Sequence, residues 1–132
     1  MTGAKTVLIV EEDDALREEL AQQLRADGHR VVTLEDGFEL CDYLELAVEG
    51  KAPAPKLIVA DVDLAGVSGR QICRVLSRGE NALPFILLAR CEAEGAGAGA
   101  VRVLNKSLAL AELHAEISGV LCGLAAEQTT AA

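Results

Sequence analysis

Aromatic residues are almost absent from this sequence, which contains no Trp, one Tyr and two Phe in 132 residues. Hydrophobic residues still make up 51% of the chain, so we expect a packed core built from Leu, Val, Ile and Ala. A chain of this length fits one domain and leaves no room for a second of ordinary size. We therefore expect one domain over residues 1–125 and a flexible C-terminal tail over residues 126–132, because the ending EQTTAA has no apolar face.

Basic residues are few relative to acidic ones, with 12 Lys and Arg against 21 Asp and Glu and a net charge of −9. Such a charge repels phosphate groups, which argues against binding to nucleic acid by this chain alone and against binding to anionic membranes. Long apolar runs are also missing. The N-terminal segment MTGAKTVLIV contains only the short run VLIV before acidic residues begin, so it predicts neither a signal peptide nor a membrane span. We expect a cytoplasmic protein that binds a cation or basic partner surfaces.

Sequence motifs of several other protein classes are lacking. No two of the four cysteines are spaced as C-x-x-C, which argues against a zinc site. We expect Cys41 and Cys73, which lie in helical patterns, to be small core residues. The run GAGAGA is not followed by Gly-Lys-Ser/Thr, so it does not predict a phosphate-binding loop.

Short apolar runs rich in Val, Ile and Leu recur along the chain, at residues 6–10, 30–34, 57–60, 85–88 and 101–104. Runs of this kind are typical of strands that are buried on both faces of a parallel sheet. The segments between them have apolar residues at helical spacing, such as Leu16, Leu20 and Leu24. Alternation of strand and helix predicts right-handed β-α-β units and an α/β fold with a doubly wound, five-stranded parallel sheet.

One of the expected helices is compromised by its glycines. The segment ARCEAEGAGAGA, which follows the fourth predicted strand, contains Gly95, Gly97 and Gly99. Each glycine costs a helix about 1 kcal/mol relative to alanine. We therefore expect a loop or a frayed turn, so that the fourth helix of the fold is degenerate.

Acidic residues directly follow two of the predicted strands. The run EEDD at residues 11–14 follows the first strand, and Asp61 and Asp63 follow the third. Ligands of a doubly wound sheet bind outside the carboxyl ends of its strands, so Glu11, Glu12 and Asp61 converge there if the two strands are neighbours. Carboxylates this close require a shared cation or a raised pKa, and oxygen ligands suit Mg²⁺. The alternative is that these acids stabilise the start of the next helix, which we favour for the last two acids of EEDD.

Two segments, VLIVEEDDALREEL and PKLIVADVDLAGVSGRQIC, resemble the receiver domain of bacterial two-component response regulators. The resemblance extends from about residue 5 to residue 122. The family pattern has an acid pair after strand one, an Asp after strand three followed by x-x-L-P-G-x-x-G, a Thr or Ser after strand four, and a Lys after strand five. Asp61 matches the phosphoacceptor, and Leu64, Gly66 and Gly69 support the alignment. The segment VRVLNKSLALAEL makes Lys106 the matching lysine.

The resemblance implies a flavodoxin-like sheet with strand order 2-1-3-4-5 and Mg²⁺-dependent transfer of a phosphoryl group to Asp61 from a histidine kinase or a phosphotransfer protein. It implies that Mg²⁺ is held by Glu12, Asp61 and the backbone carbonyl of Asp63, with Glu11 as the other acid of the pair. Lys106 would contact the phosphoryl group. Such a domain catalyses only its own phosphorylation, is not otherwise an enzyme, and signals through altered protein contacts. The sequence identifies no downstream target and leaves homodimer formation open.

The sequence departs from the family pattern at its switching positions. Ala89 stands where the family has a Thr or Ser, and a hydrogen bond to a charged group is worth about 1.5–3 kcal/mol, so we expect weaker stabilisation of the phosphoryl group. Val103 occupies the aromatic switch position, and Lys106-Ser107 replaces the usual Lys-Pro. These departures leave a second hypothesis open, in which the chain is a pseudo-receiver that acts as a phosphorylation-independent protein-interaction module.

Overall fold

Five parallel strands form a single sheet in the computed structural model, which describes residues 5–130 and the side chains of residues 5–126. The strands are β1 (Thr6–Val10), β2 (Val31–Leu34), β3 (Pro55–Asp61), β4 (Phe85–Ala89) and β5 (Arg102–Asn105). Their order across the sheet is β2-β1-β3-β4-β5, which confirms the predicted doubly wound, flavodoxin-like arrangement.

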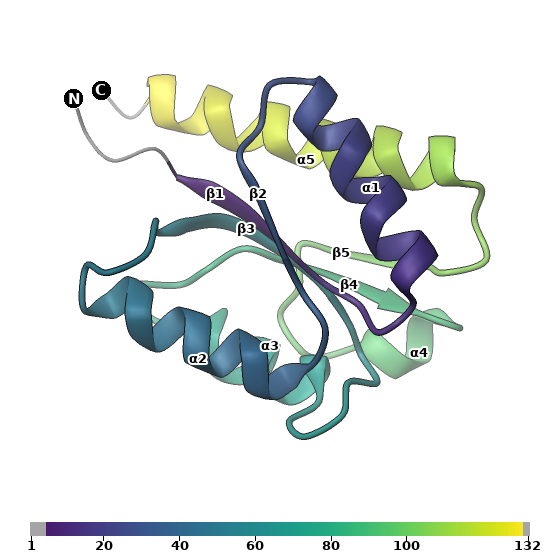
Figure 1. Ribbon diagram of the computed structural model, residues 1–132, viewed down its shortest axis with the longest axis horizontal. Coiled ribbons are helices and arrows are strands. Elements are labelled where there is room, and N and C mark those ends of the chain that lie inside the picture. Colours follow the sequence, from purple (N-terminus) through teal and green to yellow (C-terminus); the bar gives the residue numbers. More distant parts are fainter. Residues whose placement is uncertain (1–4, 131–132) are drawn as a thin grey trace.

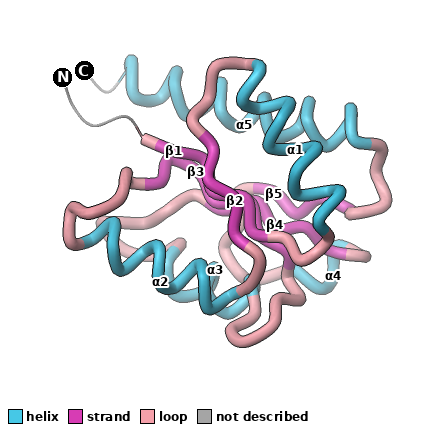
Figure 2. Tube along the Cα trace, in the orientation of Figure 1, coloured by secondary structure: helices cyan, strands magenta, loops and turns pink. Residues whose placement is uncertain are grey.

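Helices cover both faces of this sheet (Figure 1, Figure 2). On one face lie α1 (Asp14–Ala26) and α5 (Leu110–Thr130). On the other face lie α2 (Gly37–Val48), α3 (Gly69–Leu76) and α4 (Glu92–Gly95). All helices run back from the carboxyl ends of the strands, as right-handed crossovers require. Loops that carry functional residues therefore gather at one edge of the sheet.

The core is divided by the sheet into two layers, and β1 contributes to both. Val7 and Ile9 pack under α1 and α5, whereas Leu8 and Val10 pack under α2 and α3, and all four side chains are fully buried. Successive side chains of a strand point to opposite faces, so a central strand needs apolar residues at every position. This explains why the strand segments are continuous apolar runs rather than alternating patterns.

The connection between β4 and β5 contains the shortest helix, as expected. α4 has only 4 residues, and Gly97 and Gly99 have φ values of 78° and 90°, a region that residues with a side chain rarely adopt. Three bonds from α3 and its C-cap fasten this connection. Arg70 Nη2 donates to the Ala96 carbonyl at 2.9 Å, and Cys73 Sγ and Ser77 Oγ donate to the Ala98 carbonyl at 3.4 Å and 3.1 Å.

Helix α5 continues beyond the boundary expected at residue 125, because it ends at Thr130. Alanine, glutamate and glutamine favour helix, so the segment AAEQ carries α5 past residue 125, and the helix ends at the two threonines, which favour helix less. The last part of the expected tail, residues 131–132, lies outside the described residues.

The two helical cysteines lie in different surroundings. Cys73 is fully buried, which confirms its prediction as a core residue, but Cys41 is exposed, so its prediction is wrong. Leu40 and Tyr43 form the buried side of α2, which turns Cys41 toward its outer flank. None of the helices in the described part of the chain is long and apolar enough to cross a membrane.

Candidate functional site

An acidic cavity of ≈ 280 Å³ lies at the carboxyl edge of the sheet. It is lined by Glu11, Glu12, Asp13, Asp61, Asp63, Arg90 and Lys106. β1 and β3 are neighbours, with Val10 paired to Ala60, so the residues that end these strands emerge side by side. The structure thus brings together the acids that follow the first and third strands with the lysine that follows the fifth.

Lys106 joins two of the carboxylates that line this cavity. Its ammonium donates a hydrogen bond to Asp61 Oδ2 and lies 3.1 Å from Glu11 Oε1 and 3.3 Å from Glu11 Oε2. Glu11 is only 1% exposed and Asp61 only 5% exposed, so both carboxylates are largely desolvated, whereas the Lys106 side chain is 27% exposed. No peptide bond in the described residues is cis, so the bond from Lys106 to Ser107 is trans and the lysine still reaches Asp61.

The position of Asp61 is fixed by its own loop and by α3. Its Oδ1 accepts a hydrogen bond from the Asp63 backbone N–H at 2.9 Å. A Cβ atom at Gly69 would lie 2.0 Å from the Asp61 carbonyl oxygen, so only glycine lets the start of α3 approach Asp61 this closely. The glycine in the sequence motif is therefore required by the packing of α3 against the end of β3.

Burial and neighbouring charges shift two pKa values in this cavity. Burial raises the pKa of Glu11, and the charge of Asp61 raises it further, while the Asp13 N–H and Lys106 partly oppose the shift. Burial works to lower the pKa of Lys106, but hydrogen bonds to Asp61 and Glu11 outweigh it and raise that pKa. Lys106 therefore stays positively charged beside Asp61 at neutral pH.

Glu12 and Asp63 line the same cavity, but their carboxylates have partners other than Lys106. Glu12 Oε2 accepts a hydrogen bond from the Ala65 N–H at 2.6 Å, and Asp63 Oδ2 lies 3.7 Å from Arg90 Nη2. Accordingly, no three Asp, Glu, His or Cys side chains among the described residues are arranged to hold a metal ion together. The predicted Mg²⁺ ligands therefore lie around one cavity without forming a finished coordination shell.

The donor set nevertheless fits a hard cation in its chemistry. Every candidate ligand from Glu11, Glu12, Asp61 and Asp63 is an oxygen, which is the ligand type that Mg²⁺ takes in proteins. Glu11 Oε1 is a buried oxygen that accepts no hydrogen bond from the part of the chain that the structure describes, although the Lys106 ammonium is near it. This carboxylate retains the capacity to bind a cation.

The acids that follow Glu12 serve mainly to start α1. Asp13 is the N-cap, and its carboxylate accepts a hydrogen bond from the Leu16 N–H at 3.2 Å. Asp14 lies in the first turn, where negative charge is stabilised by the helix dipole. This confirms the interpretation favoured for these two residues.

Arg17 is a positioning residue that the sequence patterns did not reveal. Its side chain is buried, and its Nη1 donates to the Glu11 carbonyl at 2.8 Å, which fixes the turn between β1 and α1. A signal was present in its spacing. Arg17 precedes the buried residues Leu20, Ala21 and Leu24 by three, four and seven positions, which places it on the inner side of α1.

The position beside the cavity on β4 holds no hydroxyl group. Ala89 is fully buried at the end of β4, and its carbonyl accepts a hydrogen bond from the Lys106 N–H at 2.8 Å. The next residue, Arg90, is exposed and lines the cavity. Its backbone N–H donates to Glu94 Oε1 at 2.8 Å, which ties the start of α4 to the end of β4.

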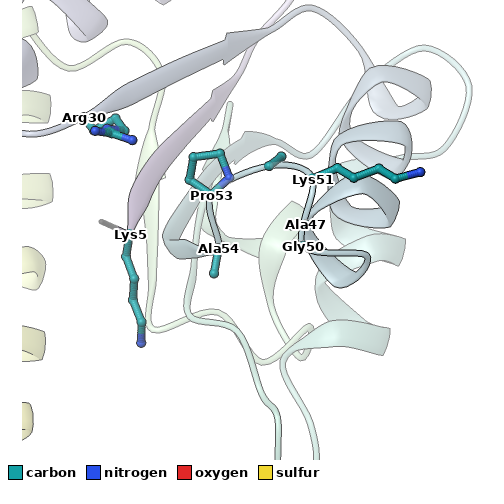
Figure 3. Close-up of a pocket in the computed structure, with 8 residues that line it drawn as sticks. Lys5, Arg30, Ala47, Gly50, Lys51, Pro53 and Ala54 are labelled. Carbon is teal, nitrogen blue, oxygen red and sulfur yellow. The ribbon is translucent and has the colours of Figure 1, made fainter. Parts of the chain in front are cut away.

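A second hollow, of ≈ 500 Å³, lies at the opposite end of the sheet, between the starts of the strands and the end of α2. Lys5, Arg30 and Lys51 line it. Their side chains point in different directions rather than toward a common centre (Figure 3), so they do not form a converging anion site. The acidic cavity remains the candidate site.

Comparisons with known proteins agree with this geometry. A sequence model of the response regulator receiver domain matches residues 7–118. The chain is 42% identical over 83 residues to the transcriptional regulatory protein AfsQ1 of Streptomyces coelicolor, covering 63% of this chain and 34% of that protein. It is 31% identical over 120 residues to the response regulator MprA of Mycolicibacterium vanbaalenii, covering 87% of this chain and 49% of that protein.

A solved structure shows the same similarity in three dimensions. The signal receiver domain of a signal transduction histidine kinase from Syntrophus aciditrophicus superposes with a TM-score of 0.76 at 25% identity, covering 91% of this chain and 92% of that one. The chain spans no more than half the length of AfsQ1 or MprA. The match to the family model, over most of the sequence, confirms the resemblance read from its motifs: this chain belongs to the response regulator receiver domain family.

Proposed function

We propose that this receiver domain accepts a phosphoryl group on Asp61 in a Mg²⁺-dependent reaction and signals through altered protein contacts. The observation that carries the proposal is the contact of the Lys106 ammonium with Asp61 inside the acidic cavity. A largely buried carboxylate with a fixed orientation and an adjacent cation is suited to attack phosphorus and to neutralise the charge of the product.

The proposed donor is a phosphohistidine of a histidine kinase or of a phosphotransfer protein. An oxygen of Asp61 forms a bond to phosphorus while the phosphorus–nitrogen bond of the donor breaks, and the imidazole leaves with the electron pair. The Lys106 ammonium then contacts the phosphoryl oxygens and neutralises the negative charge that they bring to the domain. The Asp63 N–H, which holds Asp61 Oδ1 at 2.9 Å, keeps the carboxylate in position.

We propose that Mg²⁺ is held by Glu11, Glu12, Asp61 and the backbone carbonyl of Asp63. When bound, the ion supplies neutralisation of the phosphoryl oxygens. Glu12 would have to leave the Ala65 N–H to reach the ion. Coordination of Mg²⁺ by Glu12 therefore competes with the hydrogen bond from the Ala65 N–H, which favours weak and reversible binding of the ion.

A phosphoryl group on Asp61 would lack one contact that the family pattern provides, the hydroxyl at the end of β4. Ala89 offers no hydroxyl, so one oxygen would meet only water or the exposed Arg90 side chain. Receiver domains act between histidine kinases and effector domains. We propose that this chain also acts on an effector. We further propose a cytoplasmic location, because its four cysteines are free and a reducing compartment keeps thiols free.

The test is incubation with acetyl phosphate and Mg²⁺ followed by intact-mass measurement. We expect the addition of one phosphoryl group to the wild type and none to Asp61→Asn. Asp63→Asn is the matched control, because it removes an exposed carboxylate of the same loop and should keep the adduct. A wild type that gains no mass and does not respond to beryllofluoride would overturn the proposal. The hypothesis that the chain is a phosphorylation-independent interaction module would then stand.

A further inference from the structure

The outer surface of α2 and α3, on the lower side of the molecule in Figure 1, exposes large apolar side chains. Phe38 on α2 is 61% exposed and Val75 on α3 is 72% exposed. Between the two helices runs a groove of ≈ 420 Å³, lined by Cys41, Val67, Gln71, Ile72, Val75 and Leu76. We call this surface, with the charged residues that flank it, the α2–α3 face. Clustered apolar groups on a surface mark sites of protein association.

The two helices of this face carry opposite charges. α2 contains acidic residues and no Lys or Arg, whereas α3 contains arginines and no acidic residue, and Arg78 follows at its end. Asp42 and Glu45 on α2 and Arg74 and Arg78 on the α3 side are all exposed. None of the four forms an ion pair or a side-chain hydrogen bond with any residue that the structure describes. These charges are therefore available to a partner.

The opposite charges also lie at matching heights along the groove. α2 and α3 start close together, because the Gly37 N–H donates to the Ala65 carbonyl in the loop before α3 at 3.1 Å. Asp42 and Arg74 each lie five residues after the first residue of their helix. At about 1.5 Å per residue, both are roughly 7–8 Å from the shared edge. Glu45 and Arg78 lie farther along, at similar distances from that edge.

We propose that the α2–α3 face binds a second copy of this chain through a two-fold axis that runs along the groove. Such an axis stacks α2 of one copy on α3 of the other, so that Asp42 meets Arg74 and Glu45 meets Arg78 in both halves of the contact. Val75 borders the groove and lies near the axis, where it meets its own equivalent. A two-fold axis across the helices would instead stack α2 on α2, acid against acid. The charge pattern therefore selects one arrangement of the dimer.

This dimer does not depend on the phosphoacceptor. The acidic cavity lies at the edge of the sheet where the helices begin, whereas the α2–α3 face is their outer side. The proposal therefore stands apart from phosphorylation. Asp61→Asn, which removes the acceptor, should leave self-association unchanged, and this separates a failure of the dimer from a failure of the proposed reaction.

The experiment is sedimentation equilibrium of the wild type and two charge-reversal variants, each alone and then mixed. Arg74→Glu places an acid on both α2 and α3 where Asp42 meets Arg74, and Asp42→Arg places a base on both. Each variant alone should dimerise about tenfold or more weakly than the wild type, because like charges then oppose each other in both halves of the contact. An equimolar mixture should regain dimers, because every contact of the mixed dimer again joins opposite charges.

Arg102→Glu is the matched control, since Arg102 is exposed on β5 and its reversal changes the net charge as Arg74→Glu does. It should dimerise like the wild type, and circular dichroism melts establish that every variant is folded. Three results would each overturn the proposal. These are a wild type that stays monomeric at millimolar concentration, an Arg74→Glu variant that dimerises no more weakly than Arg102→Glu, and a mixture that fails to recover dimers.

Discussion

Restoring a hydroxyl at the end of β4 should strengthen binding of a phosphoryl group. Ala89 follows Leu88, the residue paired with Asp61 across the sheet, and it is fully buried. Ala89→Thr supplies the missing hydroxyl at this position. Ala89→Val is the isosteric control, because it adds the same volume without a hydrogen-bonding group.

The expected magnitude follows from comparing these two variants. A hydrogen bond to a charged group contributes about 1.5–3 kcal/mol, which corresponds to roughly 10- to 150-fold in affinity. Both variants add two heavy atoms to a closed core around Ala89, which costs about 1–3 kcal/mol of folding stability. That cost is shared, so the difference in ligand affinity between Thr and Val isolates the hydroxyl.

The assay is titration of each variant with beryllofluoride in saturating Mg²⁺, followed by amide NMR shifts, with urea unfolding to establish that both variants are folded. We expect the Thr variant to bind beryllofluoride more tightly than both the Val variant and the wild type. Equal affinity of folded Thr and Val variants would refute the reasoning. It would mean that the phosphoryl oxygen near Ala89 is already satisfied, for which Arg90 is the nearest candidate donor.

Two further predictions concern stability. Gly69→Ala places a Cβ 2.0 Å from the Asp61 carbonyl and should destabilise the domain by about 1–3 kcal/mol or more in urea unfolding, whereas Gly119→Ala on α5, where a Cβ meets nothing within 4 Å, should stabilise it by up to about 1 kcal/mol. Similar effects of the two changes would contradict the close packing at Gly69. Because the pKa of Glu11 is raised above 4.5 in the folded state, wild-type stability should fall as pH rises from 4.5 through that folded pKa. Glu11→Gln should remove this fall, and an unchanged pH profile of unfolding would show that Glu11 does not cause it.

The fold was predictable because its signals are local. A strand buried on both faces needs an apolar residue at every position, and the runs that became β1, β3 and β4 meet this requirement. The glycines after β4 predicted a loop or frayed turn in place of a regular fourth helix for the same reason, since helix propensity is a property of each residue, and only four residues there are helical. α5 runs on to Thr130, into the segment expected to be a flexible tail, although that segment has no apolar face.

Side-chain exposure on the helices was less predictable. Cys41 fits an apolar stripe with Leu40 and Leu44, yet it is exposed, because the position of α2 over the sheet decides which flank is covered. Arg17 shows the converse. The sequence patterns assigned it no role, but it is buried and donates to the Glu11 carbonyl, which the turn after β1 leaves in need of a donor.

The sequence by itself determined that acids follow the first and third strands and a lysine follows the fifth, and that Ala89 replaces a hydroxyl. Parallel strands bring their carboxyl ends to one edge, so the positions of the acids predicted a shared site, and the resemblance to the family added Lys106 and the missing hydroxyl. Only the tertiary structure decided that Lys106 bridges Glu11 and Asp61, that Glu12 turns to Ala65, and that α2 and α3 set opposite charges side by side. Each of these depends on how elements far apart in the chain pack against each other, as Lys106 and Glu11 do across 95 positions, and no local pattern encodes that packing.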